Sequence, residues 1–420
     1  MDEAPPSLRR IGLSKLETRR CPAVQRFCSV FQQILKLVSR AEFEQLVQEH
    51  GSDRNAKGFD SWSQFVAMTF CQLGRAQSLR EIEQGLASAE GRLQQLGVTE
   101  GPKRSTLAYA NAHRPWQLYR SVFHELFSRC QSIAPGHRFR FKSKLLSLDS
   151  TTIDLCAEVF DWAKFRRTKG AVKLHLLLDH DGHLPRFAVI TDGKGSDIEV
   201  ARRLELPAGS IVVFDRGYND YLWFTELTIF GVGFVTRMKE GSLYEVVETC
   251  EPKGTGVRTD QIITIRTKHE EVDQQPVRLR RIEFTDAESR EYVFLTNRLD
   301  LAAGTIAEIY RQRWQIESFF KAIKQNLRIK TFVGTSENAL HIQIWTALIA
   351  ILMLRYLQLR AKWGWSLSNL IAMIRLNLFT YRDLWRWLDE PFTPPDVGGD
   401  DPQLSLLDST AGGVVLASAI

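Results

Sequence analysis

The sequence predicts an α/β protein in which a helical N-terminal domain precedes a mixed-sheet core, and the core carries a β-rich insertion. Three observations lead to this prediction. Apolar residues recur at helical spacing before about residue 130; strands then alternate with hairpin turns and later with helices; only short alternating strands occur between 239 and 297. A length of 420 residues suits two or three domains.

Changes of pattern along the chain define the expected domains. We expect a flexible N-terminus, a helical domain, a core with C-terminal helices that is split by the insertion, and a flexible tail rich in Pro, Gly, Asp and Ser. In this order, the parts comprise residues 1–20, 21–135, 140–238 with 298–390, 239–297, and 391–420.

The helical domain contains a pattern typical of DNA-binding proteins. The run "SWSQFVAMTFCQL" is followed by Gly74 and by "SLREIEQGL", in which Ser78 can cap the second helix and Glu81 completes a capping box. A helix, a glycine turn and a capped helix resemble a helix-turn-helix, so residues 21–135 are expected to bind DNA. Small helical bundles show the same pattern, and this alternative stays open.

Positive charge is concentrated in two stretches of a chain whose net charge is +6. Between Gly101 and Lys144 the only acid is Glu125, against nine Lys and Arg residues, and "KFRRTKGAVK" contains no acid. Such runs fit the binding of a polyanion, although either run alone fits a solvated face equally well.

Cysteine usage and hydropathy favour a cytoplasmic protein. The six cysteines include no CxxC pair, which is typical of reduced thiols and disfavours a structural zinc site. The N-terminus has no signal-peptide pattern. The most apolar run, from Ile344 to Leu354, is too short to span a bilayer, so no membrane contact is expected.

The core begins with three strands joined by hairpins. "KLLSLDSTT" is expected to be a strand ending in Asp149, and "AVKLHLLLD" and "LPRFAVITDG" are joined by the turn "HDGH". A helix with Ser196 as its cap follows, and then a buried strand, "SIVVF", ends in Asp215. A helix closed by Gly231 leads to the strand "VGFVTRM". This order predicts one mixed sheet with helices packed on it.

Asp149 and Asp215 follow buried strands in equivalent contexts. If the strands are neighbours, the two carboxylates lie close together, and their repulsion and desolvation are costly unless a cation joins them. Mg²⁺ is the natural candidate because it prefers oxygen ligands and retains positions for water and phosphate.

The run "IYRQRWQIESFFKAIKQ" supplies a third acid. Tyr310, Arg313, Glu317 and Lys324 share one face of a continuous helix. Three carboxylates that hold two metal ions can activate a hydroxyl nucleophile and stabilise the leaving oxygen of an in-line phosphoryl transfer. The alternative for Glu317 is an i,i+4 ion pair with Arg313 or Lys321.

Other polar residues of the core are expected to have structural roles. Asp154 and Asp179 suit the rim of the sheet, and Asp192 and Asp197 suit a turn and a helix cap. His175 is expected to be a hydrogen-bonded strand histidine.

The strand-ending runs "LDST" and "FDRGY", together with "YRQRWQIESFFKAIK", resemble the DDE transposases of bacterial insertion sequences, in particular the insertion-sequence-four family. Its signature, Y-(2)-R-(3)-E-(6)-K, matches Tyr310, Arg313, Glu317 and Lys324. The resemblance covers about residues 145–360. It implies an RNase H-like catalytic core in which Asp149, Asp215 and Glu317 bind two Mg²⁺ ions, with Mn²⁺ as a substitute. Tyr310, Arg313 and Lys324 would then hold DNA phosphates.

The same resemblance implies cut-and-paste transposition through a DNA hairpin. Water nicks one strand, the freed 3′-hydroxyl attacks the opposite strand, water opens the hairpin, and the 3′-hydroxyl joins target DNA. The partners implied are double-stranded DNA, both as terminal inverted repeats and as target, and a second copy of the chain in a homodimer on DNA. The expected location is the bacterial cytoplasm, in association with the nucleoid.

Three further residues are expected to contact DNA, namely Arg216 of "DRGY", Trp314 and Tyr292. In relatives a tryptophan late in the insertion stacks on a flipped base, which relieves the tight bend of the hairpin. This chain has no tryptophan between Trp223 and Trp314, and Tyr292 occupies the comparable place. The alternative is a strand tyrosine packed on its neighbours. For the whole chain, the alternatives are a structure-selective nuclease on a similar core and an inactive DNA-binding relative.

Overall fold

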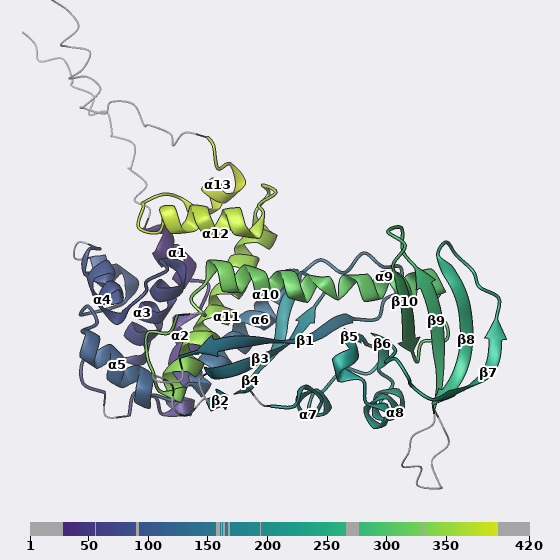
Figure 1. The fold of residues 1–420 in the computed structure, drawn as a ribbon. Coiled ribbons are helices and arrows are strands. Elements are labelled where there is room, and N and C mark those ends of the chain that lie inside the picture. The colour runs from purple at the N-terminus through teal and green to yellow at the C-terminus, as the bar shows by residue number, and fades with distance from the viewer. Residues whose placement is uncertain are drawn as a thin grey trace, which may run out of the picture.

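The protein is described by a computed structural model that covers residues 28–54, 56–89, 92–156, 160, 162, 164–166, 169–193, 195–265, 277–329 and 331–393. Ten strands of this part of the chain form one sheet with the order β2-β3-β1-β5-β6-β10-β9-β8-β7, and β4 also pairs with β3. Helices gather at one end of the sheet and the insertion extends the other end (Figure 1). The strands are β1 Leu145–Leu155, β2 Lys164–Arg166, β3 Lys169–Asp179, β4 Leu184–Asp192, β5 Ile211–Phe214, β6 Gly233–Arg237, β7 Tyr244–Cys250, β8 Val257–Ile265, β9 Arg278–Thr285 and β10 Glu291–Thr296.

The centre of the sheet has RNase H-like pairing. Strands β1, β3 and β4 are antiparallel neighbours, whereas β1, β5 and β6 run parallel. The apolar residues of β5 are fully buried, as expected for a strand that is covered on both faces. The predicted fold class, a mixed sheet with a helical N-terminal region and further strands inserted after β6, is confirmed.

The inserted strands continue the central sheet. Strand β10 pairs with β6, and β9, β8 and β7 follow as an antiparallel meander. Ile263, Leu279 and Leu295 pack in the apolar cluster that includes α8, whereas Ile282 and Phe294 pack in the cluster that includes α9. Successive side chains of a strand point to opposite faces of the sheet, so the inserted strands contribute to the apolar clusters on both faces.

Helices cover the sheet and build the N-terminal region. A long central helix, α11, packs against α3, α5, α6 and α12 and also touches β4. The helices are α1 Val30–Leu35, α2 Arg40–His50, α3 Ser61–Leu73, α4 Leu79–Ala87, α5 Arg104–His113, α6 Gln117–Ile133, α7 Asp197–Arg202, α8 Tyr221–Ile229, α9 Ala303–Gln312, α10 Trp314–Asn326, α11 Glu337–Arg360, α12 Leu367–Leu376 and α13 Leu384–Asp389, with 3₁₀ turns η1 Arg92–Leu96 and η3 Arg216–Tyr218.

Helix α11 is long and apolar enough to cross a membrane by length and composition alone. However, 83% of its most apolar stretch is buried inside the protein. Its apolar character is therefore accounted for by its contacts with the N-terminal helices. The five cysteines of the described residues are free thiols, and Cys21 lies outside that range.

Of the two helix caps predicted from the sequence, the structure contains the one at α4 and lacks the one at α7. The Ser78 side chain accepts a hydrogen bond from the Glu81 N–H, and the Glu81 carboxylate accepts one from the Gln77 N–H, so the start of α4 is capped as predicted. At α7 the Ser196 side chain makes no capping hydrogen bond, and this prediction was wrong. Asp197, the next residue, instead accepts hydrogen bonds from the sheet.

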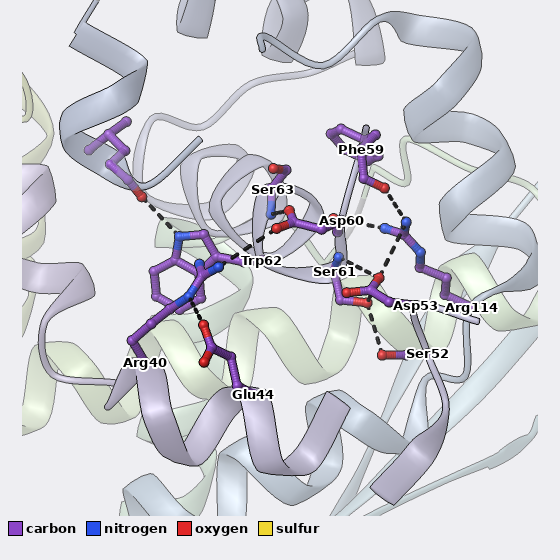
Figure 2. Close-up of polar contacts among 11 residues, drawn as sticks. Arg40, Glu44, Ser52, Asp53, Phe59, Asp60, Ser61, Trp62, Ser63 and Arg114 are labelled. Carbon is purple, nitrogen blue, oxygen red and sulfur yellow. Dashed lines mark hydrogen bonds and ion pairs between the residues drawn. The ribbon is translucent and has the colours of Figure 1, made fainter. Parts of the chain in front are cut away.

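A polar network fixes the start of the buried helix α3 (Figure 2). The Asp60 carboxylate caps α3 by accepting a hydrogen bond from the Ser63 N–H at 2.8 Å, and it also lies 3.6 Å from the Arg40 guanidinium. Arg40 in turn covers the ring of Trp62 at 4.5 Å and pairs with Glu44. The cap therefore positions a helix whose residues are all buried.

We expect Asp60→Ala to lower the free energy of unfolding by about 1 kcal/mol, because the mutation leaves an N-terminal N–H of a buried helix without its acceptor. Chemical denaturation of the two proteins measures this loss. Glu44→Ala is the matched control, since it removes an exposed acid from the same arginine but no helix cap. Equal losses in the two variants would contradict the capping role.

Candidate active site

Asp149 and Asp215 lie side by side because of the register between β1 and β5. The parallel pairing of these strands ends at Leu148 and Phe214, and each aspartate is the next residue. Asp215 ends its strand as predicted, and its carboxylate accepts a hydrogen bond from the Gly217 N–H at 2.9 Å. Asp149 does not end its strand, contrary to prediction. Strand β1 runs on to Leu155 because it stays paired with β3 beyond the point where β5 ends.

The helix expected to carry Tyr310, Arg313, Glu317 and Lys324 is divided in two. Arg313 separates α9 from α10, and two short-range hydrogen bonds tighten the chain there, from the Arg313 N–H to the Tyr310 carbonyl and from the Ile316 N–H to the Arg313 carbonyl. The prediction of one continuous helical face was therefore wrong at Arg313. The i→i+3 bonds indicate a local 3₁₀ turn, a feature often found at functional positions of helices.

Arg313 links Glu317 to Asp149 of the sheet by pairing with both acids. Its guanidinium lies 3.5 Å from an Asp149 carboxylate oxygen and 2.8 Å from a Glu317 carboxylate oxygen, and its side chain is only 8% exposed. Burial acts to lower the pKa of Arg313, but Tyr310, Glu317 and Asp149 outweigh it and the pKa is raised. The i,i+4 ion pair, considered as the alternative role of Glu317, is present. It also places Glu317 beside Asp149.

Asp149 lies in an environment that disfavours its own negative charge. Burial, and then the charges of Glu317 and Asp215, raise the pKa of Asp149 to about 6, although the Ser150 N–H and Arg313 oppose the shift. Arg313 compensates the negative charge of Asp149, Glu317 and Asp215 only in part, and a bound cation would reduce the remaining repulsion between these carboxylates. The three acids do not converge on one point in the described part of the chain, where no group of three or more acidic, His or Cys side chains has metal-binding geometry. Their carboxylate oxygens nevertheless suit a hard divalent cation.

The other signature residues lie along the same side of the sheet. Tyr310 is 5% exposed, packs 5.1 Å from the ring of Phe294, and has a pKa raised mainly by burial. Lys324 donates hydrogen bonds to the Thr151 hydroxyl at 2.6 Å and to the Thr152 carbonyl at 2.9 Å. The signature residues thus extend from Phe294 of β10 to Thr151 and Thr152 in the second half of β1, and Asp149 lies between these two ends.

The three additional residues expected to contact DNA differ in exposure. Trp314 is 60% exposed, with the Arg313 guanidinium 5.5 Å from its ring. Arg216 is exposed and lies 3.3 Å from Glu240. Tyr292 is half-buried and stacked on Phe294 at 5.6 Å, so the packing proposed as its alternative role is present.

Sequence reasoning missed Arg237 at the end of β6. Its guanidinium lies 5.2 Å from the ring centre of Tyr292, and its charge acts on Tyr310. Its position after the third parallel strand could have indicated it, since the carboxyl ends of neighbouring parallel strands meet at one edge of the sheet.

The basic runs are only partly available to a polyanion. Within the first run, Arg114, Arg129 and Lys144 form ion pairs with Asp53, Glu42 and Asp179, whereas other members are exposed, namely Lys103, Arg104, Arg120, Arg138, Arg140 and Lys142. In the second run, Lys173 binds Asp197. The side chains of Lys164, Arg166, Arg167 and Lys169 lie outside the described residues.

The raised pKa of Asp149 predicts a pH-dependent stability for the metal-free protein. Between about pH 4 and pH 6 the native state retains a proton that the unfolded state releases, so the stability falls as pH rises through this window. We expect Asp149→Asn to be more stable than wild type at pH 7.5, by up to about 3 kcal/mol, and to lose this advantage near pH 4. Denaturation in the presence of chelator at both pH values measures the difference. An advantage that is the same at both pH values would contradict the assignment.

Comparison with known proteins identifies the family. Residues 140–353, more than half of the chain, match the family described as "Transposase DDE domain", and residues 28–99 match a domain of unknown function, DUF4372. A putative transposase of Sinorhizobium fredii, y4zB, is 33% identical over 60% of this chain and 71% of its own length. A probable transposase for insertion sequence element IS5377 of Geobacillus stearothermophilus is 30% identical over 64% of this chain and 72% of its own length.

Two more distant similarities extend over most of the chain. A putative transposase for insertion sequence element IS4SA of Synechocystis is 24% identical over 68% of this chain and 81% of its own length. The piggyBac transposase in a synaptic complex with hairpin DNA superposes with a TM-score of 0.43 at 9% identity, over 92% of this chain and 86% of that chain. The family match and the two most similar of these transposases establish that the chain belongs to the DDE transposases.

Proposed function

We propose that this transposase cuts transposon ends and joins them to target DNA by Mg²⁺-dependent phosphoryl transfer at Asp149, Asp215 and Glu317. One observation supports it above all: Asp149 and Asp215 follow the last paired residues of adjacent parallel strands, and Arg313 joins Asp149 to Glu317. DDE transposases use divalent metal ions; two bound Mg²⁺ ions, or Mn²⁺ in their place, would activate the nucleophile and stabilise the leaving oxygen.

The other signature residues would position the DNA backbone. Arg313 compensates the charge of Asp149 and Glu317 and offers a planar donor set for a phosphate. Lys324 would bind a second phosphate beside β1, and the Tyr310 hydroxyl would donate a hydrogen bond to a third phosphate. Trp314 and Arg216 are both exposed and would contact the flanking DNA.

The reaction that we propose proceeds through a hairpin. Water attacks one strand at the transposon end, the released 3′-hydroxyl attacks the other strand, and a second water opens the hairpin before the end joins target DNA. Tyr292 would stack on a flipped base at the hairpin. Tyr292 lies against Arg237 and Phe294 in the free protein, so it would have to turn away from them.

The assembly that we propose is a homodimer on double-stranded DNA in the bacterial cytoplasm, associated with the nucleoid. Residues 21–135 would bind the terminal inverted repeats and residues 140–238 with 298–390 would carry the chemistry, with 239–297 as the insertion and the terminal residues 1–20 and 391–420 as flexible segments. The exposed basic residues Lys103 and Arg104 at the start of α5 support the first assignment.

A single assay tests the reaction. The purified protein is incubated with labelled duplexes from the ends of its element, a supercoiled target plasmid, and either Mg²⁺ or a chelator. We expect cut ends and labelled plasmid in Mg²⁺ and neither product with the chelator. Cut ends without any labelled plasmid would instead favour the nuclease, and the absence of both products in Mg²⁺ would favour an inactive relative.

A further inference from the structure

A polar cluster lies on the face of the sheet opposite to Asp149. Ser150 follows Asp149 in β1 and therefore points to the other face, where His175 of β3 is its cross-strand partner. The Asp197 carboxylate, at the start of α7, accepts hydrogen bonds from side chains on this face. We call Ser150, Lys173, His175, Thr191 and Asp197 the Asp197 cluster.

Asp197 is the acceptor at the centre of this cluster. One carboxylate oxygen accepts a hydrogen bond from the Ser150 hydroxyl at 2.8 Å, and the other accepts one from the Lys173 ammonium at 3.1 Å. His175, which is 1% exposed, lies 3.4 Å from the same carboxylate and is held on its other side by Thr191 at 2.9 Å. Strands β1, β3 and β4 are thus joined to α7 through one acid.

Ser150 connects this cluster directly to the site. Its hydroxyl binds Asp197, and its backbone N–H donates to the Asp149 carboxylate at 2.8 Å. The same residue therefore holds two carboxylates on opposite faces of β1. Beyond Leu148, β1 no longer pairs with β5 and is paired only with β3, so the hydrogen bond from the Ser150 hydroxyl to Asp197 adds a second restraint on this part of the strand.

The second aspartate is also close to the cluster. Tyr218, in the 3₁₀ turn that follows Asp215, is 3% exposed, and the Ser150 side chain acts on its phenol. Burial raises the pKa of this phenol, and the negative charge of Asp197 adds to the shift. Asp197 therefore lies near the segments that carry both Asp149 and Asp215.

We propose that Asp197 is a positioning residue for the metal-binding carboxylate Asp149 and acts through Ser150. The proposal rests on the proposed function in one respect, namely that Asp149 binds the metal ion. Hydrogen bonds to ligating groups orient them for the metal, and the loss of such an outer partner typically weakens metal binding by about 10- to 100-fold. Asp197 does not touch the ion or the DNA in this account.

The test is the affinity of the full-length protein for Mn²⁺ alone, measured by electron paramagnetic resonance of the free ion. We expect Asp197→Ala and Ser150→Ala each to raise the Kd by about 10- to 100-fold. Asp197→Asn keeps an acceptor for the Ser150 hydroxyl and should retain most of the affinity. Glu199→Gln is the matched control, because it removes an exposed acid from the same turn of α7 without any contact to Ser150.

Asp149→Ala separates failure of this proposal from failure of the proposed function. If Asp149→Ala binds Mn²⁺ as tightly as wild type, the metal site itself is refuted. If Asp149→Ala weakens binding while Ser150→Ala and Asp197→Ala do not, only the positioning role is refuted. A loss in Asp197→Asn as large as that in Asp197→Ala would also overturn the role of Ser150. Ser150→Ala removes a single hydroxyl, so it tests the proposal even if Asp197→Ala folds poorly.

Discussion

Glu317→Gln is expected to lower the rate of DNA cleavage at transposon ends by at least about 1,000-fold, as is typical of removing one member of a catalytic group. Glutamine has almost the same size and can still accept a hydrogen bond from Arg313, so the junction of α9 and α10 should be preserved. What is lost is the negative charge that would complete the metal site with Asp149 and Asp215. DNA binding should therefore be unchanged.

The measurement is cleavage of labelled terminal duplexes, with binding followed by gel shift on the same duplexes. Glu308→Gln is the matched control, since Glu308 lies on α9 and pairs with the exposed Arg311 rather than with Arg313 or Asp149. It should cut at the wild-type rate. Cleavage by Glu317→Gln within tenfold of wild type would refute the role of Glu317.

Arg280→Ala is expected to have the largest effect on stability, a loss of about 3–5 kcal/mol in the free energy of unfolding. Arg280 of β9 and Asp260 of β8 form a two-pronged ion pair at 2.8 and 2.6 Å, and both side chains are buried. Truncation of the arginine leaves the carboxylate buried without a partner. Arg280 also binds the carbonyl of Leu301 just before α9, so its loss should loosen the connection to the helix that carries Tyr310.

Thermal and chemical denaturation of the purified variants measure this effect. Arg290→Ala is the control, because Arg290 forms a comparable pair with Asp286 on the exposed β9–β10 turn, and its loss should have no resolved effect. If the two variants unfold at the same denaturant concentration, burial of the Arg280 pair does not stabilise the insertion.

The features that could be predicted from the sequence depend on local patterns. Alternation and turn residues located the strands of the core, and apolar runs ending in an acid indicated Asp149 and Asp215. The two aspartates were predicted to lie close together if their strands are neighbours, and the register shows that β1 and β5 are neighbours, although β2, β3 and β4 lie between them in the chain. Glu317 was predicted as the third acid from its combination with the two aspartates, because its local pattern alone favours an ordinary i,i+4 ion pair.

The remaining features depend on contacts between distant parts of the chain. The helix is interrupted at Arg313 although neither proline nor glycine occurs there, so the local sequence does not predict the interruption. Arg237 lies over the ring of Tyr292 because β6 pairs with β10, a strand about sixty residues further along the chain. Asp197 was predicted to serve a helix end, whereas it accepts hydrogen bonds from strands that precede it in the chain. Long-range pairing of this kind is not encoded in periodicity.

The central claim, that Asp149, Asp215 and Glu317 bind catalytic metal ions together, is tested most directly by an Asp215→Cys variant. A thiolate binds Mg²⁺ poorly but accepts softer divalent ions such as Mn²⁺. We predict that this variant fails to cleave terminal DNA in Mg²⁺ and regains cleavage in Mn²⁺, while wild type cleaves in both. If Asp215→Cys cleaves terminal DNA at the same rate in Mg²⁺ and in Mn²⁺, or cleaves it in neither ion, the claim that Asp215 binds the metal ion is contradicted.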